Sequence, residues 1–134
     1  MTGMDEEPEV SDEQLADLAA QVFDLARAGD HEQLAAGIER GVPVDLTDWS
    51  GNTLVMLAAY HGHAVTVRML AAHGADVNRL NDRGQCPLAG AIFKGENDVV
   101  KALLAAGADP DIGTPTARES AQLFGRPELL NPES

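Results

Sequence analysis

The chain has 134 residues, of which 44% are hydrophobic, and it carries a formal net charge of −13. This length predicts one domain with enough apolar residues to form a core. The negative charge argues against binding to nucleic acid, whose phosphates are usually neutralised by lysine and arginine. Acidity also keeps a small protein dispersed in solution, so the charge alone does not define a function.

The sequence favours a cytoplasmic chain. No stretch approaches the roughly 20 apolar residues of a membrane span, so we expect no association with a membrane. Residues 1–10 lack the basic start and the apolar run of a secretory signal. The single cysteine, Cys86, excludes an internal disulfide, which fits a reducing compartment. We also expect the protein to be a monomer.

The first part of the chain predicts an acidic tail followed by two helices. Residues 1–10 are polar, acidic and contain proline, so we expect them to be disordered. Ser11 begins a Ser-x-x-Gln capping box, after which apolar residues recur at helical spacing until the helix ends near Gly29. A second helix is expected over residues 31–40, closed by Gly41.

The central part of the chain repeats itself, because residues 48–80 align with residues 81–113. Several positions of the first segment are identical in the second, namely Gly51, Ala58, Gly62, Val67, Leu70, Ala72, Gly74, Ala75 and Asp76. Other pairs are conservative, such as Tyr60 with Phe93 and Asn78 with Asp111. A fixed period of this size indicates a solenoid.

Each central unit predicts a tight turn followed by two short helices. The turn of the first is Asp48-Trp49-Ser50-Gly51, and the hydroxyl of Thr53 can cap the helix that follows. That helix should end near His61, and the second helix should span residues 64–72. The next unit copies this plan, with Pro87 in the first turn of its helix, where a missing N–H is harmless.

The outer units are degenerate copies of the central ones. Gly29 precedes Gly62 by the same period, which identifies a first repeat with a longer leading helix. Thr116 to Gly125 aligns with Cys86 to Gly95, and Glu128 to Leu130 begins a last partial helix. We therefore predict one repeat domain over residues 11–131, with repeats at 11–47, 48–80, 81–113 and 114–131.

The central motif, Gly51-x-Thr53-x-Val55-x-x-Ala58-Ala59-x-x-Gly62-His63 and then Gly74-Ala75-Asp76-Val77-Asn78, resembles the ankyrin repeat. The third unit keeps Gly84, Pro87-Leu88, Ala91, Gly95, Leu103-Leu104 and Gly107-Ala108-Asp109. The resemblance covers roughly residues 22–130. It implies an all-α ankyrin-repeat solenoid of helix-turn-helix units joined by β-turn loops, with His63 serving the fold by holding neighbouring backbone.

Departures from the family pattern identify weak points. The Thr-Pro-Leu-His turn of the family becomes Thr53-Leu54-Val55-Met56 and then Cys86-Pro87-Leu88-Ala89, which should loosen both turns. Gly37 takes the place of an inward leucine, so the first repeat is expected to be the softer end of the stack. The shortened fourth unit is the alternative weak point.

The resemblance implies a module that binds a partner protein on its concave face, without catalysis and without a cofactor. Turn tips and the ends of first helices form that face in the family. The corresponding residues are Trp49, Ser50, Asn52, Tyr60, His61, His73, Asp82, Arg83, Gln85, Phe93 and Lys94. The equivalent places in the outer units are occupied by Arg27, Ala28, Leu123 and Phe124.

Two interpretations of the aromatic residues remain open. Trp49 and Tyr60 are expected to anchor the partner, since exposed rings bury a large area at low entropic cost. Alternatively, these rings and those of Phe93 and Phe124 fill gaps left by an alanine-rich core. A rival function is an acidic decoy or inhibitor that masks a basic surface by charge, and high salt would weaken such binding.

Other chemistry is weakly supported by the sequence. His61, His63 and His73 invite a metal interpretation, but Gly62 should turn the first two in different directions, so we expect no metal site. Cys86 lies where the family has a capping threonine, and a small structural substitute is a simpler interpretation than a redox role. The sequence contains no nucleophile elbow, phosphate loop or His-Glu-x-x-His helix, so we do not expect an enzyme.

Overall fold

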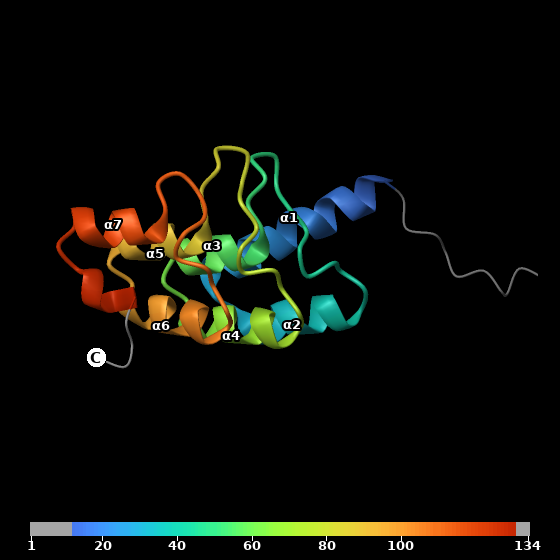
Figure 1. Cartoon of the computed structure of the whole chain (residues 1–134). Coiled ribbons are helices and arrows are strands. Elements are labelled where there is room, and N and C mark those ends of the chain that lie inside the picture. The colour runs from blue at the N-terminus through green and yellow to red at the C-terminus, as the bar shows by residue number, and fades with distance from the viewer. Residues whose placement is uncertain (1–11, 131–134) are drawn as a thin grey trace, which may run out of the picture.

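The computed structural model describes residues 12–130, in which the helices form two rows (Figure 1). The first row contains α1 (Asp12–Ala28), α3 (Leu54–Tyr60), α5 (Pro87–Lys94) and α7 (Ala117–Leu123). The second row contains α2 (His31–Glu39), α4 (Ala64–Ala72), α6 (Asn97–Ala105) and the 3-10 helix η2 (Pro127–Leu130). Each helix packs on its partner in the other row and on the next helix of its own row. The fold is therefore the predicted all-α repeat solenoid.

The helix boundaries predicted from the repeat are close to those of the structure. The second central helix has the predicted bounds, while α2 stops one residue early, at Glu39. The predicted last partial helix is the tighter 3-10 turn η2. The expected disorder of residues 1–10, the cap at Ser11 and the predicted end of the domain at residue 131 lie outside the described residues.

The first-row helices α3, α5 and α7 begin at side chains that accept a hydrogen bond from the helix backbone. Thr53 Oγ1 accepts from the Met56 N–H at 3.2 Å, and Cys86 Sγ accepts from the Ala89 N–H at 3.4 Å. Such caps satisfy N–H groups that have no partner inside the helix. The turns that we expected to be loosened therefore both retain a cap, although sulfur is the weaker acceptor. At α7, Thr116 forms a full capping box.

The core runs through the stack as columns of equivalent residues. Val22, Val55 and Leu88 occupy the same place in successive first-row helices, and all are buried. Six of the seven residues of α3 are buried, because helices of both rows and both neighbouring layers surround it. No helix within residues 12–130 is both long enough and apolar enough to cross a membrane.

One glycine shows how closely the layers approach. Gly62 has a φ of +82°, which L-residues rarely adopt, and a Cβ placed there would lie 2.7 Å from the Glu96 carboxylate of the next layer. Both the backbone conformation and the space therefore require glycine. In the layer before, the imidazole of His63 packs against Gly29 in the same manner, and His63 Nε2 lies 2.7 Å from the Arg27 carbonyl oxygen. This contact matches the structural role expected for His63.

The loops that precede α3, α5 and α7 are joined to one another in sequence order. The Asp82 N–H donates to the Ser50 carbonyl at 3.0 Å, and the Thr114 N–H donates to the Gly84 carbonyl at 2.9 Å. The side-chain amide of Asn81 donates to Asn52 Oδ1 at 2.9 Å. These bonds hold the loop tips in a row beside the first-row helices, as Figure 1 shows.

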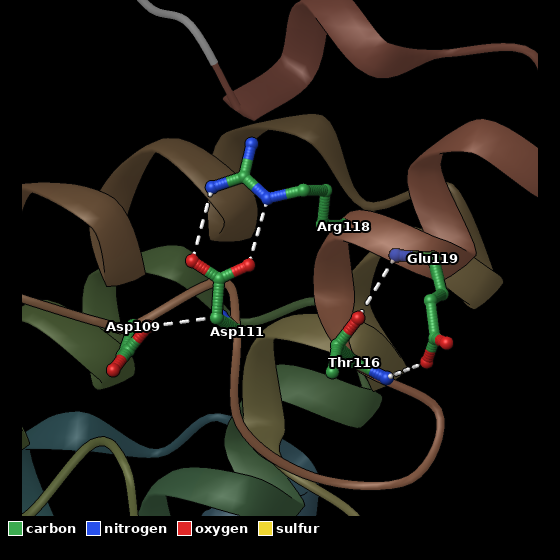
Figure 2. Close-up of polar contacts among 5 residues, drawn as sticks. All are labelled: Asp109, Asp111, Thr116, Arg118 and Glu119. Carbon is green, nitrogen blue, oxygen red and sulfur yellow. Dashed lines mark hydrogen bonds and ion pairs between the residues drawn. The ribbon is translucent and has the colours of Figure 1, made fainter.

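A second ladder of hydrogen bonds joins the segments that follow the second-row helices. Asp45 Oδ1 accepts from the Asp76 N–H at 2.9 Å, and one period later Asn78 Oδ1 accepts from the Asp109 N–H at 2.7 Å. Asp111 is the next member of this series. Its carboxylate accepts two hydrogen bonds from the guanidinium of Arg118 in α7 (Figure 2).

Candidate partner-binding groove

A groove of about 620 Å³ lies between the loop tips and the first-row helices of the last three layers. We call it the aromatic groove. Its loop side includes Ser50, Asn52, Asn81, Arg83, Gln85 and Pro115. Its helix side includes Met56, Leu57, Tyr60, Gly90, Phe93 and Phe124.

The aromatic side chains of the groove come from successive layers and stay accessible to solvent. Tyr60 is the last residue of α3, Phe93 precedes the last residue of α5, and Phe124 follows α7; they are 43%, 62% and 45% exposed. The rings of Phe93 and Phe124 meet edge to face with centroids 5.7 Å apart. Each of three successive layers therefore exposes part of an aromatic ring in the same groove.

Tyr60 also fills space between two layers. Its Cδ1 would lie 3.6 Å from a Cβ placed on Gly90 of α5, so one edge of the ring packs beside the next helix at this glycine. The ammonium group of Lys94 lies 4.8 Å from the centre of the Tyr60 ring, on its face. Cations and aromatic faces attract one another in this arrangement. Tyr60 thus has both roles considered from the sequence, as gap filler and as exposed groove residue.

The one charged side chain among the described residues that line the groove is that of Arg83, which is positive although the chain as a whole is acidic. Lys94 lies at the edge of the groove through its contact with Tyr60, and the His61 ring meets Tyr60 edge to face at 5.9 Å. Partial burial, followed by His63 and basic neighbours, lowers the pKa of His61 below 6.5.

The structure brings most of the predicted binding residues together, but not all of them. Groove-lining residues among them are Ser50, Asn52, Tyr60, Arg83, Gln85 and Phe93. Trp49 and Asp82 lie at loop tips and do not line the groove; Trp49 is fully exposed, at 101%.

His73 differs from the other predicted residues. It ends α4 in the second row, where its Nδ1 lies 2.9 Å from the Met69 carbonyl oxygen and its Nε2 lies 3.8 Å from a Glu39 carboxylate oxygen. His73 belongs to the end of a second helix, and the groove is formed by first helices and loops. The structure therefore does not place His73 with the other predicted residues.

Sequence reasoning missed the floor of the groove. Gly90 takes the place that Leu57 holds in α3, so a side chain is absent where the layer before has a leucine. The repeat register contains this signal, because the two positions are one period apart. Cys86 also borders the groove, but it is 3% exposed and caps α5.

The histidines make separate contacts. His63 faces the Arg27 carbonyl, His61 meets the Tyr60 ring, and His73 contacts Met69 in the second row. No group of three or more potential metal ligands occurs within residues 12–130.

Most of the chain matches the sequence model of one protein family. A family model of three ankyrin repeats matches residues 22–114. An ankyrin repeat protein of Pseudomonas aeruginosa is 49% identical over 49 residues, which are 37% of this chain and 29% of that protein.

Two longer matches come from mammalian proteins. Protein phosphatase 1 regulatory subunit 27 of Mus musculus is 34% identical over 90 residues, 66% of this chain and 58% of that protein. Ankyrin repeat and SOCS box protein 3 of Bos taurus is 32% identical over 115 residues, 84% of this chain and 22% of that protein. The chain spans less than two thirds of the length of each of these three relatives.

Proposed function

Because this chain belongs to the ankyrin repeat family, whose members are protein–protein interaction modules, we propose that it binds a partner protein on its concave face. The aromatic groove is the centre of the proposed interface. Binding there requires neither catalysis nor a cofactor, and we assign the chain no enzymatic role. The partner, rather than a reaction, defines its function.

The exposure of aromatic residues in the groove carries this proposal. Tyr60 and Phe93 occupy equivalent positions in adjacent layers, and both keep about half of their surface in contact with solvent. Contiguous exposed apolar area on a soluble protein usually marks a site of interaction. Aromatic side chains also dominate the energetic centres of interfaces. A partner would therefore gain most by covering these two rings.

The remaining predicted residues surround this centre. Trp49 extends the surface beyond the groove at a loop tip, where it is free to contact a partner. Arg83 and Gln85 supply hydrogen-bond donors from the next loop, and Lys94 adds a positive charge beside Tyr60. This layout, an apolar centre with a polar rim, is typical of protein interfaces.

Affinity capture with the full chain as bait tests the proposal. Proteins captured by the wild-type chain are quantified alongside captures by Tyr60→Ala and Phe93→Ala, each shown to be folded by circular dichroism. Val65→Ala is the matched control, because Val65 is 51% exposed but lies on α4, in the second row. We expect at least about tenfold weaker capture of one partner by both groove variants, and no change with the control. Equal capture by all four proteins would contradict a partner site at the groove.

The net charge of −13 favours a second candidate, an acidic decoy that masks a basic surface. The Debye length falls from about 10 Å at 0.1 M salt to about 3 Å at 1 M, so binding by charge would be lost over this range. Binding through the aromatic groove would survive. Repeating the capture at both salt concentrations separates the two functions.

A further inference from the structure

The floor of the aromatic groove is open because of one substitution within the repeat. Gly90 replaces the leucine found at the equivalent place in α3, and a Cβ there would meet no heavy atom closer than Tyr60 Cδ1 at 3.6 Å. Tyr60 of the layer before and Phe93 of the same helix line the groove together with this position. The opening is thus lined by aromatic and aliphatic groups, which suits an apolar side chain.

The charged side chain that lines the loop side of the groove is positive, whereas the chain as a whole is acidic. Arg83 lines the groove without a carboxylate beside it in the lining, and its guanidinium forms no ion pair or hydrogen bond within the described residues. Arg27, Arg118 and Arg126 do have such partners, whereas Arg40, Arg68 and Arg79 share the unpaired state of Arg83 but lie outside the groove lining. An accessible guanidinium on an acidic protein can form a two-pronged contact with a carboxylate of a partner.

We propose that the aromatic groove binds a peptide segment of a partner protein that carries an apolar side chain next to a carboxylate. The apolar side chain packs over Gly90 between Tyr60 and Phe93, and the carboxylate contacts Arg83. Lys94, on the face of the Tyr60 ring, attracts the same negative charge. This inference rests on the proposed function, since it specifies the partner of that groove. Local charge complementarity selects an acidic segment although the chain as a whole would repel it.

Selection from a phage-displayed library of random linear peptides on the immobilised full chain tests the inference. Enriched peptides are then synthesised, and their affinities are measured by fluorescence polarisation. We expect the enriched peptides to share an apolar residue close to aspartate or glutamate. Arg83→Glu should weaken their binding by roughly tenfold or more, because attraction becomes repulsion. Arg68→Glu is the matched control, since Arg68 is exposed on α4 outside the groove, and it should leave affinity nearly unchanged.

Filling the floor tests the apolar half of the inference. Gly90→Leu restores the residue of the equivalent position in α3 and should abolish binding. Gly90→Ala, which meets Tyr60 only at ordinary contact distance, covers the case in which the larger variant does not fold. It should weaken binding, whereas Gly37→Ala, the same exchange in α2, should not.

The outcomes separate this inference from the proposed function. Some enriched peptides could bind Phe93→Ala more weakly than wild type and yet lack a carboxylate, or bind Arg83→Glu as tightly as wild type. Either result would overturn the inference and leave the groove as the partner site. Basic peptides, peptides that bind Phe93→Ala as well as wild type, or no enrichment at all would overturn both. Competition by a peptide of residues 1–10 would assign the groove to the chain's own N-terminal segment and overturn a separate partner.

Discussion

Arg118 and Asp111 form a two-pronged ion pair, with Nε 2.7 Å from Oδ1 and Nη2 3.2 Å from Oδ2 (Figure 2). In earlier layers the residue equivalent to Asp111 accepts a backbone N–H from the following repeat, as Asn78 does from Asp109. Among the described residues the unit after Asp111 is a short one, and a side chain of α7 takes the place of that backbone donor. The pair therefore closes the hydrogen-bond ladder at the C-terminal end of the described solenoid.

The closing ion pair should make stability depend on pH in a defined direction. The hydrogen bond from Arg118 lowers the pKa of Asp111 below 3.8, its usual value. Because its pKa is lower in the folded state, the Asp111 carboxylate adds to the free energy of unfolding. This stabilisation is complete above pH 3.8 and is lost as the pH falls through the folded-state pKa. Arg118→Gln should therefore unfold more easily than wild type at pH 7, and this difference should vanish below the folded-state pKa. Urea unfolding at a series of pH values measures it.

Arg40→Gln serves as the control for this experiment, because Arg40 is exposed at the end of α2. Hydrogen exchange should also show faster amides in α7 of Arg118→Gln, with little change in α3, since solenoid units contact only their neighbours. The same profile tests whether a chain end of the wild type opens before residues 55–70. Uniform protection along the wild-type chain would contradict that expectation.

His63→Ala should destabilise the junction between the first two layers. The change removes the contact of Nε2 with the Arg27 carbonyl and leaves space against Gly29. Loss of one hydrogen bond and its packing predicts a decrease of about 1–2 kcal/mol in the free energy of unfolding. His31→Ala is the control, since His31 is at the start of α2. Equal unfolding midpoints in urea for the two variants would show that the contact is not stabilising.

Thr66→Val should stabilise the chain. Thr66 is 1% exposed, and its Oγ1 has no hydrogen-bond partner among the residues that the structure describes. A buried hydroxyl without a partner costs roughly 1 kcal/mol or more, and valine has nearly the same shape. Val99 already occupies the equivalent place in α6, where it is also buried. Thermal unfolding should give a higher midpoint than wild type; a lower midpoint would mean that the hydroxyl has a favourable role.

Gly37→Ala should stabilise α2 by about 1 kcal/mol, the usual difference between the two residues inside a helix. The nearest heavy atom to the new Cβ would be Val42 Cγ2 at 3.8 Å, so the methyl group fits. Gly62→Ala is the informative contrast, because positive φ and the Glu96 carboxylate both oppose a side chain there. Gly37→Ala should raise the melting temperature, and Gly62→Ala should lower it. Shifts of the same sign would refute this account of the glycines.

Alanine substitution of Trp49 and Tyr60 should separate binding from stability. Trp49→Ala should leave the melting temperature unchanged, because the side chain is fully exposed. Tyr60→Ala should lower it moderately, since the ring packs beside Gly90 of the next layer and contacts Lys94. If the residue is an anchor, each substitution should weaken the free energy of partner binding by about 2 kcal/mol, which is roughly thirtyfold in affinity. Unchanged affinity in both would place the binding surface elsewhere.

Local rules explain why the fold was predictable from the sequence. Glycines at a fixed period end the helices, and Thr53 or its equivalents begin them, so each unit defines its own boundaries. The role of His63 followed from its place in the family motif. The two central repeats had enough identical residues to set the register for the weaker outer ones.

Features that depend on two layers were not predictable in the same way. The opening at Gly90 exists only because Tyr60 of the layer before stands beside it without filling it. The Arg118 pair depends on how the loop from Asp111 to Thr116 returns the chain to α7 (Figure 2). His73 was grouped with the concave residues although its position in the repeat is the end of a second helix, as the structure shows.

The full exposure of Trp49 gives the molecule an optical reporter for its partner. The chain contains one tryptophan, and in the folded state its indole is already surrounded by solvent. Unfolding therefore changes the surroundings of the ring little, and the emission spectrum should hardly shift while the circular dichroism of the helices is lost. A partner that covers the loop tip would move the emission to shorter wavelength. Tryptophan fluorescence should therefore report binding of the partner but change little when the protein unfolds.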